Sequence, residues 1–254
     1  MSSITPKRVY NCKIARLPPN ELKMKPMKLR AAPLPDYVDL RPKMPPVYDQ
    51  GNLGSCTANA LCAAFECIVP NYMGSRLFLY YNERMLENTI PDDQGAFLSD
   101  GIKCMEKYGI CEESQWPYDP PKFAVKPPDK CYEDALTHRV ISASNIPDTL
   151  YGMKQSLADG FPFVVGITLY DSFETAEVAA TGMVPIPNPW ENCLGGHAVL
   201  VCGYDDNTQL FTVRNSWGSA WGHDGYFYLP YAYLANPNLS TDMWNITAVD
   251  VGKN

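Results

Sequence analysis

Hydrophobic residues along this chain of 254 residues are spaced in two different ways. Up to about residue 160 they recur every three or four positions, the spacing that places them on one face of an α-helix. Expected helices cover residues 76–88, 99–109 and 148–160, and another begins at or just before Cys56. Ser99 is the expected N-cap of the second of these helices, and Gly109 is its expected end.

Beyond residue 160 the apolar stretches are short and rich in β-branched and aromatic residues, which predicts strands. They lie at 161–170, 197–205, 210–217 and 225–230, and residues 204–209 have the turn-forming sequence of a hairpin. Helices followed by strands predict an α+β protein whose two lobes meet in a cleft.

The net charge of −7 is the sum of a basic N-terminus and an acidic remainder. Residues 1–43 hold ten Lys or Arg against three Asp or Glu, whereas residues 44–254 hold eleven against twenty-five. Nine of the 23 prolines fall within residues 1–46, which disfavours long helices there. We therefore divide the chain into a basic, proline-rich N-terminal segment, residues 1–35, and a folded body, residues 36–254.

The N-terminal segment has three interpretations. Polar, proline-rich termini are often disordered. The positive charge of this one also suits docking on the acidic body, as a short prosegment would dock. An arm that binds nucleic acid is the weakest interpretation, because no aromatic residues are interleaved with the basic ones.

Neither a membrane span nor a secretory signal is expected. The chain has no run of about 18 apolar residues, and its N-terminus lacks the apolar core of a signal peptide. The expected partners therefore include no membrane and no nucleic acid, and the chain is expected to be a monomer.

Nine cysteines are present, at positions 12, 56, 62, 67, 104, 111, 131, 193 and 202. No CxxC pair occurs, and the three histidines are scattered, so neither a metal site nor a cofactor is expected. A free cysteine usually behaves as a small buried hydrophobic residue, which is the first interpretation of each one here.

Cys56, in the stretch QGNLGSCTANA, has surroundings that fit a nucleophile. At the N-terminus of a helix, a thiol experiences the positive end of the helix dipole, which favours the thiolate. Gln50 lies across a glycine-bearing loop from Cys56 and carries a side-chain amide that could donate a hydrogen bond to an oxyanion.

His197 in LGGHAVLV and Asn215 in RNSWG fall near matching ends of two strands that a hairpin would pair. A lone histidine beside an apolar strand is more often structural, but the flanking Gly-Gly and the matched Asn favour a catalytic base.

The stretches QGNLGSC, GGHAV and RNSWGSAWG resemble the three signature blocks of papain-like cysteine peptidases, in the order Cys, His, Asn. His197 lies 141 residues after Cys56 and Asn215 lies 159 after it, close to the 130 to 150 residues typical of that family. The resemblance spans about residues 36–230. It implies a papain-like two-lobed fold, with a helical N-terminal lobe, an antiparallel β-rich C-terminal lobe and the active-site cleft between them.

The resemblance also assigns roles to individual residues. Cys56 matches the nucleophile, His197 the base and later the acid, Asn215 the residue that orients the histidine, and Gln50 the oxyanion-hole donor. Two tryptophans of the third block match the family's supporting pair, Trp217 and Trp221. For substrate binding, Gly95 matches the glycine whose backbone pairs with the substrate, and Phe97 and Ala198 match residues that line the pocket for the second residue before the cut.

The sequence departs from the family pattern at several points. Thr57 stands where a tryptophan usually follows the nucleophile, a change that affects the primed side of the cleft. The cysteine that usually forms a disulfide near this block is absent, which favours a reducing intracellular compartment, or a virus particle, over secretion. Family members that lack both this tryptophan and the disulfide resemble microbial and viral proteins, so the resemblance is to a divergent microbial or viral type. Cys12 and Cys193 are either a redox latch over the cleft or two ordinary thiols.

The expected activity is that of a cysteine endopeptidase that hydrolyses protein or peptide substrates through an acyl-enzyme. The N-terminal segment is expected to dock on its own catalytic domain as a short, zymogen-like prosegment. Two alternatives stay open: an acyl transferase that uses the same triad, and a catalytically silent binding or scaffold protein with the papain fold.

Overall fold

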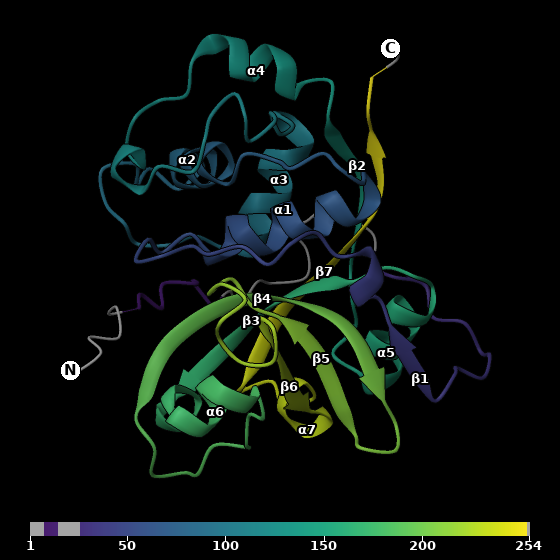
Figure 1. Cartoon of the computed structure of the whole chain (residues 1–254). Coiled ribbons are helices and arrows are strands. Elements are labelled where there is room, and N and C mark those ends of the chain that lie inside the picture. Colours follow the sequence, from purple (N-terminus) through teal and green to yellow (C-terminus); the bar gives the residue numbers. More distant parts are fainter. Residues whose placement is uncertain (1–7, 15–25, 253–254) are drawn as a thin grey trace.

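Seven strands form one antiparallel sheet in the computed structural model, which describes residues 8–14 and 26–252. The strand order is β2-β7-β3-β4-β5-β6, and β1 pairs with β4 outside this path (Figure 1). The strands are β1 (Tyr37–Asp39), β2 (Arg139–Asn145), β3 (Phe163–Tyr170), β4 (Cys193–Asp205), β5 (Leu210–Arg214), β6 (Tyr226–Pro230) and β7 (Ser240–Asp250).

Four helices gather above this sheet in the upper part of Figure 1. They are α1 (Cys56–Ile68), α2 (Arg76–Leu86), α3 (Leu98–Lys107) and α4 (Asp129–Ala135). Three further helices accompany the strands: α5 (Leu150–Ala158), α6 (Ala176–Thr181) and α7 (Tyr231–Leu234). The chain thus has the two-lobed α+β architecture of a papain-like fold, with helices in the first lobe and the antiparallel sheet in the second.

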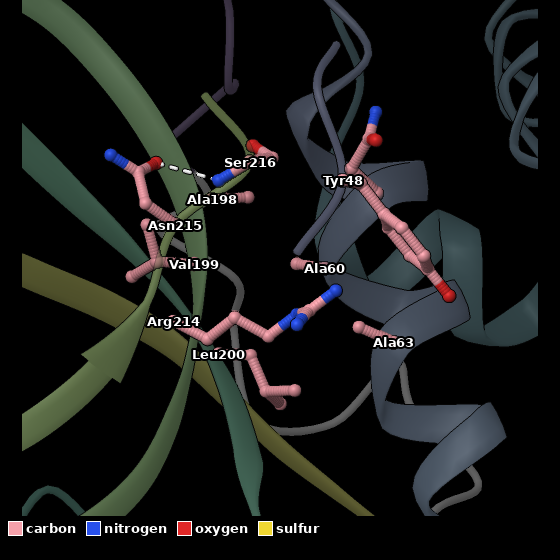
Figure 2. A pocket seen from close by; sticks show the side chains of 10 residues that line it. Tyr48, Ala60, Ala63, Ala198, Val199, Leu200, Arg214, Asn215 and Ser216 are labelled. Atoms are coloured by element: carbon pink, nitrogen blue, oxygen red, sulfur yellow. Dashed lines mark hydrogen bonds between the residues drawn. The ribbon is translucent and has the colours of Figure 1, made fainter. Parts of the chain in front are cut away.

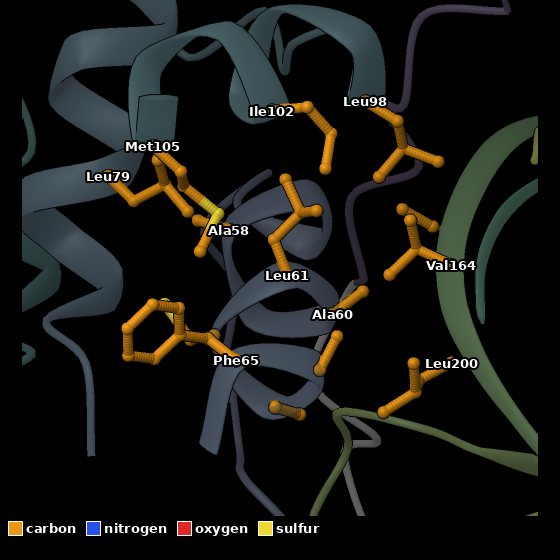
Figure 3. Close-up of a cluster of buried hydrophobic side chains, with 14 of the residues drawn as sticks. Ala58, Ala60, Leu61, Phe65, Leu79, Leu98, Ile102, Met105, Val164 and Leu200 are labelled. Carbon is orange, nitrogen blue, oxygen red and sulfur yellow. The ribbon is translucent and has the colours of Figure 1, made fainter. Parts of the chain in front are cut away.

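The sheet buries both of its faces because alternate residues along a strand point to opposite sides. Val164 of β3 and Leu200 of β4 face α1, whereas Val165 and Val199 belong to a second core on the other side of the sheet. Figure 3 shows Ala60 of α1 between the helical core and the two sheet residues that face it. The small side chain of Ala60 lets α1 and the sheet approach closely, so α1 lies against β4.

The expected helices are present with shorter ends. Residues 76–88, 99–109 and 148–160 correspond to α2, α3 and α5, and α1 begins at Cys56 as expected. Gly109 ends α3, because its φ of +74° is left-handed and a Cβ there would lie 1.8 Å from the carbonyl oxygen of Ala135.

The prediction that Ser99 caps α3 is wrong. The helix begins at Leu98, its N-cap is Phe97, and no side chain of the cap bonds to the backbone. The carboxylate of Asp242, in β7, accepts the Ser99 N–H at 3.3 Å instead. A residue from the other lobe therefore replaces the local cap.

The expected strands 161–170, 197–205, 210–217 and 225–230 correspond to β3, β4, β5 and β6. Strand β4 begins earlier than expected, at Cys193, and β5 ends earlier, at Arg214. The hairpin between these two strands forms, with Asp205 paired to Leu210. No helix within residues 8–14 and 26–252 is long and apolar enough to cross a membrane.

Thr57 turns its side chain into the helical lobe. It is fully buried, and its hydroxyl donates to Oε2 of Glu83 in α2 at 2.7 Å. Burial raises the pKa of Glu83 well above its ordinary value, because a buried carboxylate loses its hydration. The Thr57 hydroxyl lowers this pKa in part, and the other oxygen, Oε1, has no hydrogen-bond partner among the described residues. The residue after Cys56 is therefore part of a buried polar pair.

We predict that Leu61→Ala lowers the free energy of unfolding by about 3 kcal/mol, because it leaves a cavity in the core between α1 and α3. Leu61 is fully buried. Leu136→Ala is the matched control, since Leu136 is 53% exposed and its truncation should cost less than about 0.5 kcal/mol. Urea unfolding of the three proteins measures both values, and equal losses in the two variants would contradict the packing described here.

We also predict that Glu83→Gln makes stability less dependent on pH. Above the ordinary value of 4.5, the folded state keeps a proton on Glu83 that the unfolded state has released, so stability falls as pH rises. The variant should remove this fall, which is at most about 1.4 kcal/mol per pH unit. Urea unfolding between about pH 5 and pH 8 measures the slope. The exposed Glu133→Gln is the control, and identical slopes in wild type and Glu83→Gln would refute the prediction.

Candidate active site

Cys56 is the first residue of α1 and is fully buried. As the first helical residue, it carries a backbone N–H that has no partner within the helix. The loop before it is fixed by the Gly54 N–H, which donates to the carboxylate of Asp93 at 3.0 Å. The thiol and this N–H therefore sit together at the positive end of the helix.

His197 lies in β4, and Asn215 directly follows β5. The two strands pair as expected, and Nε2 of His197 lies 2.8 Å from Oδ1 of Asn215. Because Asn215 Oδ1 also accepts the Ser216 N–H at 2.9 Å, it acts as an acceptor toward the histidine. Nε2 then carries the proton, which leaves the other ring nitrogen, Nδ1, as the reactive one.

Trp217 covers this histidine. Its ring stacks on His197 with centroids 4.9 Å apart, and it packs edge-on against Trp221 at 4.9 Å. Phe173 then stacks on Trp221 at 5.7 Å. The hydrogen bond between His197 and Asn215 is thus enclosed by aromatic rings, which exclude competing water.

Gln50 is 2% exposed, and its amide is held at both ends. Nε2 donates to the carbonyl of Leu53 at 2.9 Å, and Oε1 accepts from the hydroxyl of Ser216. Ser216 was not identified from the sequence, although it lies within RNSWG. It fixes which end of the Gln50 amide donates, and only the three-dimensional fold shows that it reaches Gln50.

The environment of Cys56 lowers the pKa of its thiol well below the ordinary value. The largest cause is a hydrogen bond from the thiol of Cys12; burial acts in the opposite direction, and the His197 ring and the Ala198 N–H lower the pKa further. Nδ1 of His197 is buried and has no other hydrogen-bond partner among the described residues. The thiolate of Cys56 is therefore the favoured form beside this ring.

A cavity of about 10 Å³ lies behind these residues, between α1 and the strands β4 and β5 (Figure 2). Tyr48, Ala60, Arg214 and Asn215 line it. This volume is about that of one water molecule, too small for a substrate side chain. The cavity is therefore not a binding pocket for substrate.

Residues 8–14, which we call the docked segment, cross the site. The backbone N–H of Cys12 donates to the carbonyl of Gly196 at 3.0 Å, and that of Lys13 donates to the carbonyl of Ala96 at 3.0 Å. Gly196 belongs to the β-rich lobe, and Ala96 precedes α3 in the helical lobe. The docked segment is therefore hydrogen-bonded to both lobes.

Charged side chains reinforce this docking. Arg8 forms an ion pair with Glu174 at 3.5 Å, and its guanidinium lies 3.9 Å from the ring centre of Trp217. Lys13 forms an ion pair with Glu87, next to α2. Basic residues of the N-terminal segment thus meet acidic residues of both lobes.

Two glycines make room for the backbone of the docked segment. A Cβ on Gly196 would lie 2.1 Å from the carbonyl oxygen of Cys12, and one on Gly95 would lie 1.7 Å from that of Asn11. Any side chain at either position would therefore displace the segment. The open space that Gly-Gly leaves in front of His197 is occupied by the protein's own chain.

The residues expected to bind substrate lie around the docked segment. Gly95 contacts Asn11, the half-buried Phe97 lies 5.6 Å from the Lys13 ammonium, and the Ala198 N–H interacts with Cys56. Ala96, whose carbonyl receives a backbone hydrogen bond from the docked segment, was not identified from the sequence.

The chain forms no disulfide among its nine cysteines, all of which lie within the described residues. All nine cysteines are free, and Cys193 is exposed at the start of β4. Cys12 is buried in the same cluster as Cys56, and its thiol donates to the carbonyl of Lys13 at 3.8 Å. No group of three or more metal-ligating side chains is present within the described residues.

Comparisons with known proteins agree with this geometry. The model of the papain family of cysteine proteases matches residues 34–242. A peptidase C1-like protein of Acanthamoeba polyphaga mimivirus is 46% identical over 215 residues, which is 79% of this chain and 69% of that protein. Cysteine proteinase 3 of Entamoeba histolytica is 27% identical over 200 residues, 77% of this chain and 62% of that protein.

Solved structures show the same likeness. Xylellain, a cysteine protease from Xylella fastidiosa, has a TM-score of 0.85 and 39% identity, and the match covers 94% of this chain and 95% of that one. Digestive procathepsin L 3 of Tenebrio molitor, at 22% identity and a TM-score of 0.71, shares the fold over 94% of this chain and 76% of its own. From the family model, the viral relative and the fold together, the chain belongs to the papain family and is a cysteine peptidase.

Proposed function

We propose that this chain is a cysteine endopeptidase that hydrolyses peptide bonds through an acyl-enzyme formed on Cys56. The observation that carries the proposal is the buried series Cys56, His197 and Asn215, in which Asn215 holds Nε2 at 2.8 Å and leaves Nδ1 to the thiol. A nucleophile, a base and a group that orients the base are the parts that thiol catalysis needs.

The reaction follows from these positions. The thiolate of Cys56 attacks the scissile carbonyl carbon, and the π electrons move to the oxygen. Nδ1 of His197 holds the proton that the Cys56 thiol released. As the oxyanion re-forms the carbonyl, the C–N bond breaks and Nδ1 gives this proton to the leaving amine, which leaves a thioester. The same nitrogen then takes a proton from water as the water attacks the thioester, and the C–S bond breaks to release the acid and return the thiolate.

Two donors are available for the oxyanion. One is the Cys56 N–H at the start of α1, which has no partner within the helix. The other is the second amide hydrogen of Gln50, since Leu53 accepts one of the two. Ser216 supports this role because it holds Oε1 and so keeps the NH₂ end of the amide in place.

The same proposal makes residues 1–35 an inhibitory prosegment and residues 36–254 the catalytic domain. The docked segment forms backbone hydrogen bonds on both sides of Cys56, to Ala96 and Gly196. A substrate needs the same place to reach the thiol. The chain with the segment docked is therefore latent.

We predict that Cys12→Arg raises the rate of peptide hydrolysis by about tenfold or more, because the long Arg side chain does not fit the buried space that the small Cys12 side chain fills, and the segment leaves. Ile14→Arg places the same charge two residues away, on a side chain that is 42% exposed, and should leave the rate unchanged. A chain that begins at Pro35 should match the Cys12→Arg rate. Rates that do not differ among all four proteins would show that the segment does not inhibit.

We further predict, in the Cys12→Arg background, that Cys56→Ala abolishes turnover and that Gln50→Ala lowers kcat about 10²- to 10³-fold, the usual loss for one oxyanion donor. Cys62→Ala is the control, because Cys62 is a fully buried thiol on the same helix whose pKa is raised by burial. It should keep its activity and still react with an epoxide at Cys56. Turnover in Cys56→Ala equal to that of the control would rule out the proposed nucleophile.

A further inference from the structure

Two thiols meet at the site, and only one has a role in peptide hydrolysis. Cys12 of the docked segment is 5% exposed, Cys56 is fully buried, and both side chains belong to one buried cluster, where the docked segment packs against Gly54 and Gly196. We propose that Cys12 is the redox partner of Cys56, and that mild oxidation by a peroxide joins their sulfur atoms in a disulfide that locks the docked segment over the site. The inference rests on the proposed role of Cys56 as the nucleophile.

The backbone holds the Cys12 sulfur in this place. The Cys12 N–H donates to Gly196 at 3.0 Å, and the Cys12 carbonyl oxygen lies where a Cβ of Gly196 would be. On its far side, the sulfur lies 3.6 Å from the position that a Cβ on Gly166 of β3 would take. The Cys12 thiol donates to the Lys13 carbonyl at 3.8 Å, and the sulfur is held against β3 and β4 in the buried cluster that also contains Cys56.

The two thiols have opposite acidities, as an oxidation partner and its target require. The pKa of Cys56 is lowered, first by the hydrogen bond from Cys12 and then by His197, whereas the same hydrogen bond and burial raise the pKa of Cys12. The thiolate is the form that reacts with peroxides. Cys56 is thus the sulfur that is oxidised first, and Cys12 is the neutral thiol that resolves it.

The steps balance with one molecule of hydrogen peroxide. The Cys56 thiolate attacks one peroxide oxygen, an S–O bond forms as the O–O bond breaks, and hydroxide leaves with a proton as water, which gives a sulfenic acid. The Cys12 sulfur then attacks the Cys56 sulfur, the S–S bond forms as the S–O bond breaks, and the Cys12 proton leaves with the hydroxyl as a second water. The two thiols lose two electrons, and the peroxide gains them.

The disulfide has two effects on the protein. It removes the nucleophile, and it replaces the reversible contacts of residues 8–14 with a covalent bond across a loop from Cys12 to Cys56. A dithiol reductant reverses both effects by thiol–disulfide exchange. Because a disulfide is reducible and a sulfinic acid is not, the partner also protects Cys56 from irreversible oxidation.

Other thiols in the chain provide internal controls. Cys111 and Cys131 form a second buried pair whose thiols interact, but burial raises the pKa of both. Cys193 is exposed and lies in the same strand as His197. The proposal therefore requires that the first disulfide joins Cys12 to Cys56, and not Cys111 to Cys131 or Cys12 to Cys193.

The test uses the reduced full chain treated with about one equivalent of hydrogen peroxide, enough for one disulfide. Free thiols are then blocked, the chain is digested without reductant, and the peptides are identified by mass spectrometry. In parallel, peptide hydrolysis is measured before and after addition of dithiothreitol. Cys12→Ser removes the partner at nearly constant volume, and Cys104→Ser removes a buried thiol of α3 as the matched control.

The expected product in the wild type and in Cys104→Ser is a peptide that links Cys12 to Cys56, and dithiothreitol should restore activity to within about twofold of the untreated value. All three proteins are then given about three equivalents, enough to carry one thiol to a sulfonic acid. In Cys12→Ser, Cys56 should then be found as sulfinic or sulfonic acid, with more than about tenfold loss that dithiothreitol does not reverse.

Two results overturn the proposal: a first cross-link that joins Cys12 to Cys193 or Cys111 to Cys131, or equal and irreversible loss in the wild type and Cys12→Ser. If the reduced full chain and the chain that begins at Pro35 both fail to cleave peptides, the proposed function fails. The presence or absence of the cross-link between Cys12 and Cys56 then decides the redox inference alone.

Discussion

The structure depends on the close packing of α1 against the sheet. Small residues on this helix, such as Ala60, let its first turn approach β4, where His197 lies. Without that approach Cys56 would be an ordinary thiol at the N-terminal end of a buried helix, because its pKa is lowered first by Cys12 of the docked segment and then by His197 and Ala198 of the β-rich lobe. The pairing of β4 with β5 and the ring of Trp217 stacked on His197 fix the position of this histidine. Helix α1 then brings the Cys56 thiol to it.

The second constraint is the set of hydrogen bonds that Ser216 makes within the candidate site. Ser216 holds the amide of Gln50 and also donates its N–H to Asn215 Oδ1, so one residue orients both the proposed oxyanion donor and the partner of the histidine. Because all three side chains are buried, water does not compete for these bonds. A change at Ser216 would therefore disturb two groups at once.

Local patterns in the sequence were enough to predict α1 from Cys56, the hairpin that pairs β4 with β5, and the fold class. Strands β2 and β7 were not predicted, because β7 pairs with β2 and with β3, partners far away in the sequence, and RVISASN in β2 has no regular alternation of apolar residues. The prediction that Ser99 caps α3 failed for a similar reason, since Asp242 of the distant strand β7 accepts the Ser99 N–H. The burial of Cys12 in the same cluster as Cys56 was not predicted, because it depends on how two distant segments meet.

The absence of a Cβ at Gly95 and Gly196 has a consequence for latency. The same two gaps that admit the docked segment are, under the proposed function, those that admit a substrate backbone. The segment is tethered, so its effective concentration at the site is of millimolar order, whereas a free substrate competes at its bulk concentration. Latency then needs no tight intrinsic affinity, and one cut in the tether, which leaves every contact in place, is enough to let the segment be diluted away.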